Sequence, residues 1–356
     1  MSQARLVLLG AGLIGREHAR LVAEFAEARL VALADPSPSA RGYAEQIGVT
    51  YYCDYERMLE AEIADGAIIA LPNYLHVPAA LACIARGIAC LLEKPVADTV
   101  AAARLLVEAS EASGVPVLVG HHRRHSPDIK EASRLVRSGA LGDLVTVSGM
   151  CLFNKPDGYF DAAWRQQPGG GPLLINLIHD IDTLRFLCGE IESVQAFTSN
   201  AVRGFAVEDT ASLILRFASG VLGSFVISDC VASPWAWEYT SGQALYFPHE
   251  PGASLFLGGR RGSLSLSDMT LWRHIPADGD WQTPFVKQRC TLKPSFAYAN
   301  QLAHFISVCA RREAPLISAL DAMLSLGATL AADAASRAGA AVVVADYLES
   351  HGYAAA

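Results

Sequence analysis

The sequence predicts an α/β protein of two domains: an N-terminal doubly wound parallel sheet, then a C-terminal α+β domain with a largely antiparallel sheet. In residues 1–120, continuous apolar runs alternate with amphipathic helical patterns, as in a parallel sheet covered on both faces. After Gly120, apolar and polar residues alternate one by one, as in strands with one solvent-facing side. The 356 residues exceed one ordinary core, which favours domains 1–120 and 121–356.

The strands of the first domain are short runs of aliphatic residues without polar interruptions. Strands that are buried on both faces of a sheet have this composition. Gly48, Gly87 and Gly114 stand where a left-handed residue would end a predicted helix, and the last two directly precede predicted strands. The predicted strands are residues 6–9, 30–34, 67–70, 88–92 and 115–119.

In the second domain, the pattern predicts helices and half-buried strands in mixed order. A short link at 218–220 ends in glycine and predicts a hairpin. Residues 230–295 are rich in Trp, Pro and Gly, and no element is predicted there. The predicted helices are 128–138, 173–187, 296–311 and 319–339, and the predicted strands are 144–151, 193–199, 210–217 and 221–228.

Composition and charge exclude several classes of protein. The net charge of −8 argues against a nucleic-acid partner, since the basic cluster at 121–125 is too short for a duplex footprint. No apolar run reaches the ~18 residues needed to span a bilayer, so no membrane partner is expected. The cysteines form no C-x-x-C pair, so neither a metal site nor disulfides are predicted, and a reduced, cytoplasmic protein is expected. They are Cys53, Cys83, Cys90, Cys151, Cys188, Cys230, Cys290 and Cys309.

A glycine fingerprint follows the first predicted strand and opens a helix: Gly10, Gly12 and Gly15, with Leu13 and Ile14 between the last two. In this context it is typical of a Rossmann dinucleotide site. The first glycine permits a tight turn, the second lets the backbone approach a pyrophosphate, and the third allows close packing of helix on strand. The helix N-terminus then faces the negative charge. A glycine turn without a ligand is the alternative.

Asp35 ends the second predicted strand, 20 residues after Gly15. A carboxylate at this spacing accepts hydrogen bonds from the adenine-ribose hydroxyls and repels a 2′-phosphate, so NAD is favoured over NADP. Ser37, Ser39 and Arg41 are near enough in sequence to keep NADP possible. A solvated aspartate in a turn is the alternative.

Further segments occur together in a known protein family. They are Leu71-Pro72-Asn73-Tyr74-Leu75-His76, Glu93-Lys94-Pro95, and residues 138–142, 169–172 and 179–182. With the glycine fingerprint, the sequence resembles the Gfo/Idh/MocA oxidoreductases over landmarks from residue 10 to about 190. The resemblance implies an NAD(P)-dependent dehydrogenase that acts on CH–OH groups.

Two of these segments follow predicted strands at the edge of an open α/β sheet, where ligands gather. Pro72, Asn73 and His76 come after the third strand, and Asn73 is expected to contact ribose or pyrophosphate. His76 is either a cofactor contact or a helix residue satisfied by backbone. Glu93 and Lys94 follow the fourth strand, and the family's equivalent of Lys94 lies beside nicotinamide and the substrate hydroxyl.

The predicted helix after the triple glycine carries a polar face. At ~100° per residue this face consists of Asn176, His179, Asp180 and Thr183. Many family members have an aspartate four residues before the histidine, but Ile175 stands there, and Asn176 cannot take a proton. His179 is therefore the expected base. A solvent-facing polar stripe would give the same pattern.

Hydride transfer from a carbinol carbon to nicotinamide requires a base whose pKa lies near the operating pH. Histidine meets this need, so His179 is expected to take the proton while Lys94 orients the hydroxyl. Asn176, Arg124 and Arg165 are expected to position the substrate, a cyclic polyol, sugar or sugar acid. Arginines that serve only as surface charges are the alternative for the last two.

Three other functions fit the same residues. A dehydrogenase of cyclic dihydrodiols and a glycosidase that uses bound NAD without net NADH are both implied by the resemblance. A non-catalytic NAD-binding sensor is the third, because Ile175 departs from the family pattern. The resemblance also implies a homodimer or homotetramer, formed through the strand-rich part at 193–230.

Overall fold

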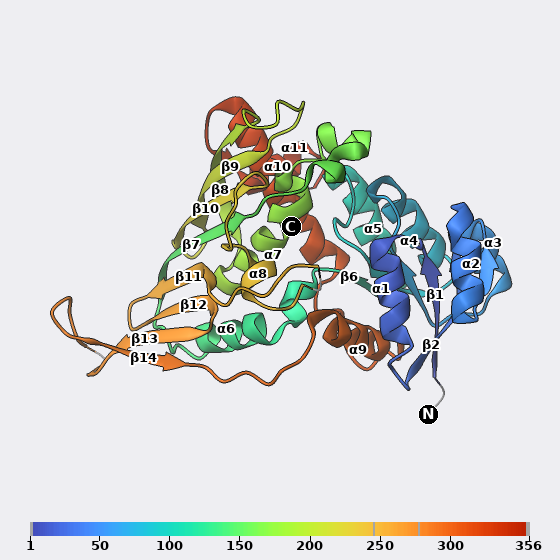
Figure 1. The fold of residues 1–356 in the computed structure, drawn as a ribbon, viewed down its shortest axis with the longest axis horizontal. Coiled ribbons are helices and arrows are strands. Elements are labelled where there is room, and N and C mark those ends of the chain that lie inside the picture. Colours follow the sequence, from blue (N-terminus) through green and yellow to red (C-terminus); the bar gives the residue numbers. More distant parts are fainter. Residues whose placement is uncertain (1–2, 245, 277, 354–356) are drawn as a thin grey trace. The chain divides into compact units, whose positions relative to one another are not determined.

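The chain divides into two compact units (Figure 1). The computed structural model describes residues 3–244, 246–276 and 278–353. The first unit runs through His122 and also contains Ala297–Leu326 and His351–Tyr353. The second contains Arg123–Phe296 and Gly327–Ser350. The first boundary lies close to the predicted one at residue 120, but the chain later returns to the first unit.

The first unit contains a parallel sheet of six strands in the order β3-β2-β1-β4-β5-β6. This confirms the predicted doubly wound parallel sheet. The strand order reverses between β1 and β4, so ligand-binding residues are expected outside the carboxyl ends of the strands. The strands are β1 (Ala4–Leu9), β2 (Ala28–Ala34), β3 (Thr50–Tyr52), β4 (Gly66–Ile69), β5 (Ala89–Leu92) and β6 (Val117–Val119).

Helices cover this sheet because its strands are apolar on both sides; every residue of β4 and β5 is buried. At Gly66 a Cβ would lie 2.6 Å from Cys309 Sγ of α9, so glycine permits a close contact between this helix and the sheet. This packing explains why α9 belongs to the first unit. The helices are α1 (Leu13–Val22), α2 (Pro38–Ile47), α3 (Tyr55–Ala61), α4 (His76–Ile84), α5 (Val100–Ser113) and α9 (Ala297–Cys309).

The second unit is built on a nine-stranded sheet in the order β14-β13-β12-β11-β7-β10-β9-β8-β15. The β10–β7 pair is parallel and the other pairs are antiparallel, which confirms the predicted, largely antiparallel second sheet. The strands are β7 (Leu144–Leu152), β8 (Ile191–Ser199), β9 (Thr210–Phe217), β10 (Leu222–Ser228), β11 (Ala253–Gly259), β12 (Ser263–Ser267), β13 (Thr270–His274), β14 (Phe285–Arg289) and β15 (Val342–Val343).

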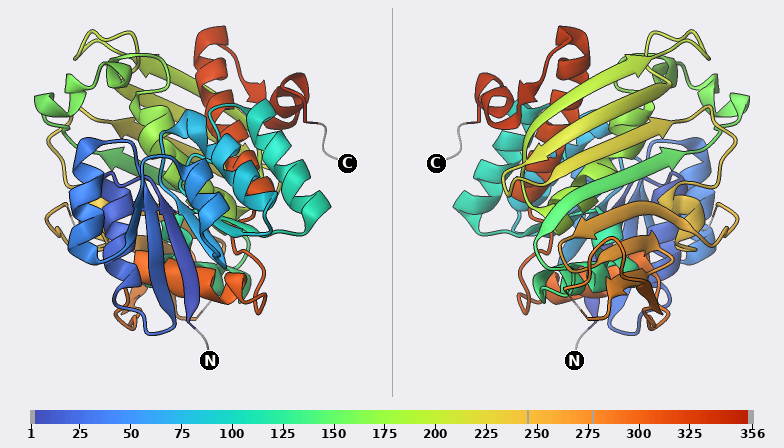
Figure 2. Two further views of the ribbon diagram at one scale, coloured as in Figure 1. Left: turned by 90° about the vertical axis from the view of Figure 1, so that its right-hand side faces the viewer. Right: turned by 90° about the vertical axis from the view of Figure 1, so that its left-hand side faces the viewer.

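One side of the second sheet faces solvent. Along β9 and β10, buried and exposed residues alternate, as expected for strands with one covered face. The right-hand view of Figure 2 looks onto the strands of this sheet. The helices of this unit are α6 (Pro127–Arg137), α7 (Ile178–Cys188), α8 (Trp237–Thr240), the C-terminal part of α10 (Ala319–Ala338) and α11 (Val344–Ser350). None of the described helices is both long and apolar enough to span a membrane.

Candidate cofactor site and active site

The glycine turn after β1 leaves backbone open to a ligand. Gly10 has a φ of +96°, and a Cβ there would lie 2.3 Å from the carbonyl oxygen of Ala70. A Cβ at Gly15 would lie 2.0 Å from the carbonyl oxygen of Gly10, so helix and turn are in contact. At Gly12, by contrast, a Cβ would meet no such neighbour within 4 Å. Leu13, the first residue of α1, is 68% exposed. This open helix N-terminus suits a pyrophosphate.

Asp35 follows β2, and its carboxylate lies against the glycine turn. It accepts hydrogen bonds from the backbone N–H groups of Ala11 at 2.7 Å and Ser37 at 2.8 Å. Partial burial opposes its charge, but hydrogen bonds from the Ser37 side chain and from these two N–H groups, together with the charge of Arg16, hold the pKa of Asp35 below its ordinary value. The carboxylate therefore stays charged at neutral pH, as a ribose acceptor must. Arg41, the candidate partner of a 2′-phosphate, lies over the ring of Tyr51, 4.8 Å from its centroid.

The loop after β4 carries Asn73, which is partly exposed and begins the 3₁₀ turn η1 (Asn73–Leu75). His76 is buried at the start of α4. Its ring nitrogens lie 2.8 Å from the carbonyl oxygen of Leu71 and 2.7 Å from that of Pro95. Burial lowers the pKa of His76. His76 lies between the loop after β4 and the loop after β5, and a neutral imidazole, with its single N–H, donates to one of these two carbonyl oxygens.

Glu93 and Lys94 follow β5 and differ in exposure. The buried carboxylate of Glu93 accepts a hydrogen bond from His18 Nε2 at 2.8 Å, and a Cβ at Gly120 would lie 3.2 Å from it. Burial opposes its charge, but the bond to His18 together with the nearby positive charges of His18, Lys94 and His76 lowers the pKa of Glu93. Lys94 is partly exposed. Glu93 therefore anchors this segment on α1, while Lys94 stands at the carboxyl edge of the sheet.

The helix predicted at 173–187 begins as a π-turn, η5 (Leu173–Leu177), and continues as α7. The assumed 100° spacing is therefore wrong across this turn, because a π-turn holds more residues than an α-turn. The predicted polar face is not solvent-facing, since His179 is 7% and Asp180 8% exposed. Oδ1 of Asn176 is buried and has no hydrogen-bond partner within the described residues. A buried acceptor of this kind usually has a donor, so Asn176 is a candidate for contact with a ligand.

A buried ion cluster lies beside His179 in the chain. Arg123 contacts Asp180 and Glu238, each at 2.6 Å, and its guanidinium lies 4.8 Å from the ring centroid of Trp237. Burial raises the pKa of Asp180 to about 6, Glu238 adds to the rise, and Arg123 opposes it. Oδ2 of Asp180 is a second buried acceptor without a hydrogen-bond partner among the described residues. This cluster did not emerge from the sequence, although Arg123 stands in the basic segment at 121–125.

The two arginines predicted to bind substrate differ in their surroundings. Arg124 is buried and forms a two-point pair with Asp182, with Nε–Oδ2 at 2.8 Å and Nη2–Oδ1 at 2.6 Å. This pair ties Arg124 to α7, which favours a structural role for Arg124 over the expected contact with substrate. Arg165 is partly exposed and lies over the ring of Tyr159, 3.8 Å from its centroid. Its Nε is buried and has no hydrogen-bond partner in the described part of the chain.

Lys155 is a buried cation that the sequence did not single out. Its Nζ lies 3.2 Å from Asp229 and 4.8 Å from the ring centroid of Tyr159. Burial lowers the pKa of Lys155, while Asp229 opposes the shift. Arg203 also pairs with Asp229, at 3.1 Å. Lys155 and Asp229 stand in irregular segments far apart in the chain, where no periodicity indicates a contact.

Two family models match the chain, one on each side of the boundary at residue 122. Residues 4–121 match the oxidoreductase family with an NAD-binding Rossmann fold, and residues 129–264 match the Gfo/Idh/MocA C-terminal domain. The chain belongs to the Gfo/Idh/MocA family. This confirms the resemblance: the protein is an oxidoreductase, and its first domain is an NAD-binding Rossmann fold.

Named relatives within the Gfo/Idh/MocA family include inositol and rhizopine proteins. The rhizopine catabolism protein MocA of Rhizobium meliloti is 32% identical over 227 residues, which are 63% of this chain and 70% of that protein. The scyllo-inositol 2-dehydrogenase (NAD(+)) of Bacillus subtilis is 27% identical over 95% of both chains. The WlbA dehydrogenase of Bordetella pertussis, solved with NADH and UDP-GlcNAcA, shares the fold with a TM-score of 0.77 at 21% identity, over 96% of this chain and 98% of that one.

Proposed function

We propose that the protein catalyses the NAD-dependent oxidation of a carbinol in a cyclic polyol, sugar or sugar acid, or the reverse reduction. The single observation that carries this proposal is the buried turn of η5 and α7, which holds His179 together with unsatisfied acceptors on Asn176 and Asp180. A buried polar helix of this kind suits a polyhydroxylated ligand, because each hydroxyl is both a donor and an acceptor.

The residues of the glycine turn fit the cofactor. Gly12 leaves room for a pyrophosphate at the N-terminus of α1, and Asp35 is charged and accessible to ribose hydroxyls. We propose that Pro72 and Asn73 contact the cofactor after β4. Bound NAD supplies the acceptor for a hydride from the carbinol carbon.

The protein's own residues handle the proton and the alignment. We propose that His179 takes the hydroxyl proton and that Lys94 donates a hydrogen bond to the same oxygen as negative charge develops on it. Asn176 and Arg165 are proposed to bind further hydroxyl or carboxylate oxygens of the substrate. Ile175 leaves no carboxylate at the family's usual acid position, so the proton is assigned to His179 alone.

A substrate panel tests this function. Cyclic polyols, aldoses, sugar acids and cyclic dihydrodiols are each incubated with NAD, and NADH is followed by its absorbance. We expect NADH with a polyol, sugar or sugar acid, as the name of the Bacillus subtilis relative suggests. NADH with dihydrodiols alone, sugar release from glycosides without NADH, or NAD binding without any turnover would each replace the proposal with the corresponding alternative.

We also propose that a second copy of this chain covers the solvent-facing side of the nine-stranded sheet, giving a homodimer or homotetramer. Large apolar side chains stand at exposed positions on five of its strands, and an extended apolar surface of this kind marks an association site. These side chains are Phe197, Ile214, Leu222, Val226, Phe256 and Trp272.

A further inference from the structure

Glu208 reaches from the residues before β9 to the start of the π-turn. Its Oε1 accepts a hydrogen bond from the backbone N–H of Leu173 at 3.0 Å. Leu173 is the first residue of η5, which carries Asn176 and leads directly into His179. Glu208 thus bonds to the end of the segment that holds the proposed base.

A glycine allows this contact. A Cβ at Gly171 would lie 2.3 Å from Oε1 of Glu208 and 2.6 Å from Cγ2 of Val207, closer than any real contact. The carboxyl group therefore occupies the space that any other side chain at position 171 would need. The last residue of the triple glycine, Gly171, therefore leaves the space that the carboxyl group of Glu208 occupies.

The first N–H groups of a helical segment have no partner within the segment, and negative charge at that end is favourable. At the start of η5, the backbone N–H of Leu173 finds its partner in the carboxyl group of Glu208, which is 35 residues away in the chain. The bond ties the N-terminal end of η5 to the sheet through β9.

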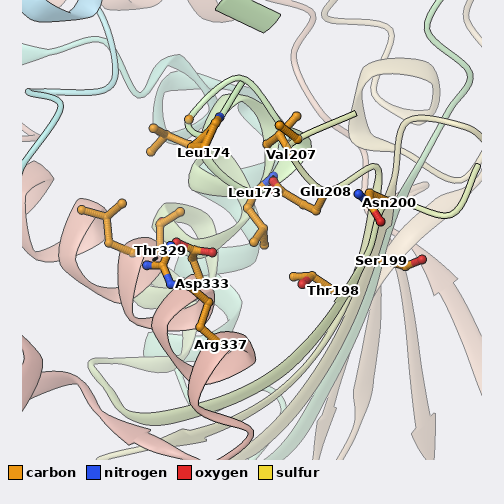
Figure 3. A pocket seen from close by; sticks show the side chains of 14 residues that line it. Leu173, Leu174, Thr198, Ser199, Asn200, Val207, Glu208, Thr329, Asp333 and Arg337 are labelled. Atoms are coloured by element: carbon orange, nitrogen blue, oxygen red, sulfur yellow. Dashed lines mark hydrogen bonds and ion pairs between the residues drawn. The ribbon is translucent and has the colours of Figure 1, made fainter. Parts of the chain in front are cut away.

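Glu208 borders a cavity of about 320 Å³ within the second unit. Figure 3 shows Glu208, Val207 and Leu173 on one wall, and Thr329, Asp333 and Arg337 on the helix at the other. Truncation of Glu208 would enlarge this cavity rather than open a void in a packed core. The fold is therefore expected to tolerate the change.

We propose that Glu208 is a positioning residue, which fixes the start of η5 and thereby the orientation of Asn176 and His179. The proposal rests on the proposed role of His179. It assigns to Glu208 no contact with substrate or cofactor.

Three variants give the first test of the proposal, with kcat, KM and the Kd for NAD measured on the substrate that the panel identifies. Glu208→Ala is expected to lower kcat about tenfold, since a small misplacement of a catalytic group costs ~10- to 100-fold. Glu208→Gln keeps an oxygen acceptor and should retain kcat within about twofold. Asp333 lines the same cavity but forms no bond to η5 among the described residues, so Asp333→Asn should keep the wild-type kcat. The Kd for NAD should stay constant in all of them.

Gly171→Ala supplies a second route to the same displacement and should lower kcat as Glu208→Ala does. In the double variant the two losses should not add, because both act through one contact. Wild-type kcat in Glu208→Ala, or additive losses in the double variant, would overturn the proposal. Equal losses in Glu208→Gln and Glu208→Ala would overturn it too.

Hydrogen–deuterium exchange of residues 173–179 gives a readout that needs no turnover. Exchange should be faster in Glu208→Ala than in the wild type and Glu208→Gln, and equal rates would contradict the positioning role. Failure of the proposed function is separate. If His179→Ala keeps full turnover, His179 is not the base, whatever the exchange data show for Glu208.

Discussion

Lys94 stands partly exposed after β5, at the edge of the sheet where ligands bind in this fold. One positioned donor to a developing oxyanion is worth ~10²–10³ in rate, so Lys94→Ala should lower turnover by about that factor. NAD titration should give an unchanged Kd. The exposed Lys130→Ala is the matched control and should behave as the wild type. Near-normal turnover in Lys94→Ala would remove it from the mechanism, and loss of NAD binding would make it a cofactor ligand.

Asp35 decides the choice of cofactor. Its charged carboxylate should accept from ribose hydroxyls and repel a 2′-phosphate, so NAD should bind more tightly than NADP. Titration of both cofactors against the wild type and Asp35→Ser should show a preference for NAD that falls in the variant. Glu45→Gln, an exposed acid on α2, should leave the preference unchanged. Equal or tighter binding of NADP to the wild type would refute the role of Asp35 and direct attention to Arg41.

At the level of elements, the sequence predicts best where a regular period matches one environment. The alternation from Thr210 to Phe217 predicts β9 with its observed bounds. The same reasoning missed the π-turn at Leu173–Leu177. A segment of only five residues, four apolar and one polar, is too short to distinguish the period of a π-turn from the 3.6-residue period of an α-helix. Between residues 230 and 295, β11 ends in Gly258-Gly259 and β14 is fully exposed, so neither shows the pattern of a half-buried strand.

The nine-stranded sheet gives a prediction about assembly. Ile214 in β9 is 58% exposed on its solvent-facing side. If a second copy covers this side, Ile214→Glu would bury a charge in the interface and should shift the mass in light scattering from an oligomer to a monomer. Ile63→Glu, at an isoleucine of the first unit that is 80% exposed, should leave the mass unchanged. A monomeric wild type, or an oligomeric Ile214→Glu, would contradict the proposal.

At the scale of the whole molecule, the sequence predicts where helices form, but it does not predict which of the two sheets each helix packs against. The pattern at 296–311 predicts α9, yet its return to the first unit depends on the contact of Cys309 with Gly66, far away in the chain. Long-range ion pairs are equally hidden. Arg123 and Asp180 are 57 residues apart, and only the fold brings them to 2.6 Å. The candidate base and the glycine fingerprint needed no such information, because each lies within one local segment.

The pH dependence of turnover at saturating NAD tests the central claim, that His179 takes the substrate proton. A protonated imidazole cannot act as a base, so the wild-type oxidation rate should fall as the pH drops and His179 becomes protonated. Asp180, with its pKa raised to about 6, would titrate nearby, so Asp180→Asn is the control. Asp180→Asn should keep the acid limb, whereas His179→Ala should lose both the limb and most of the rate. An unchanged acid limb in His179→Ala would contradict the mechanism.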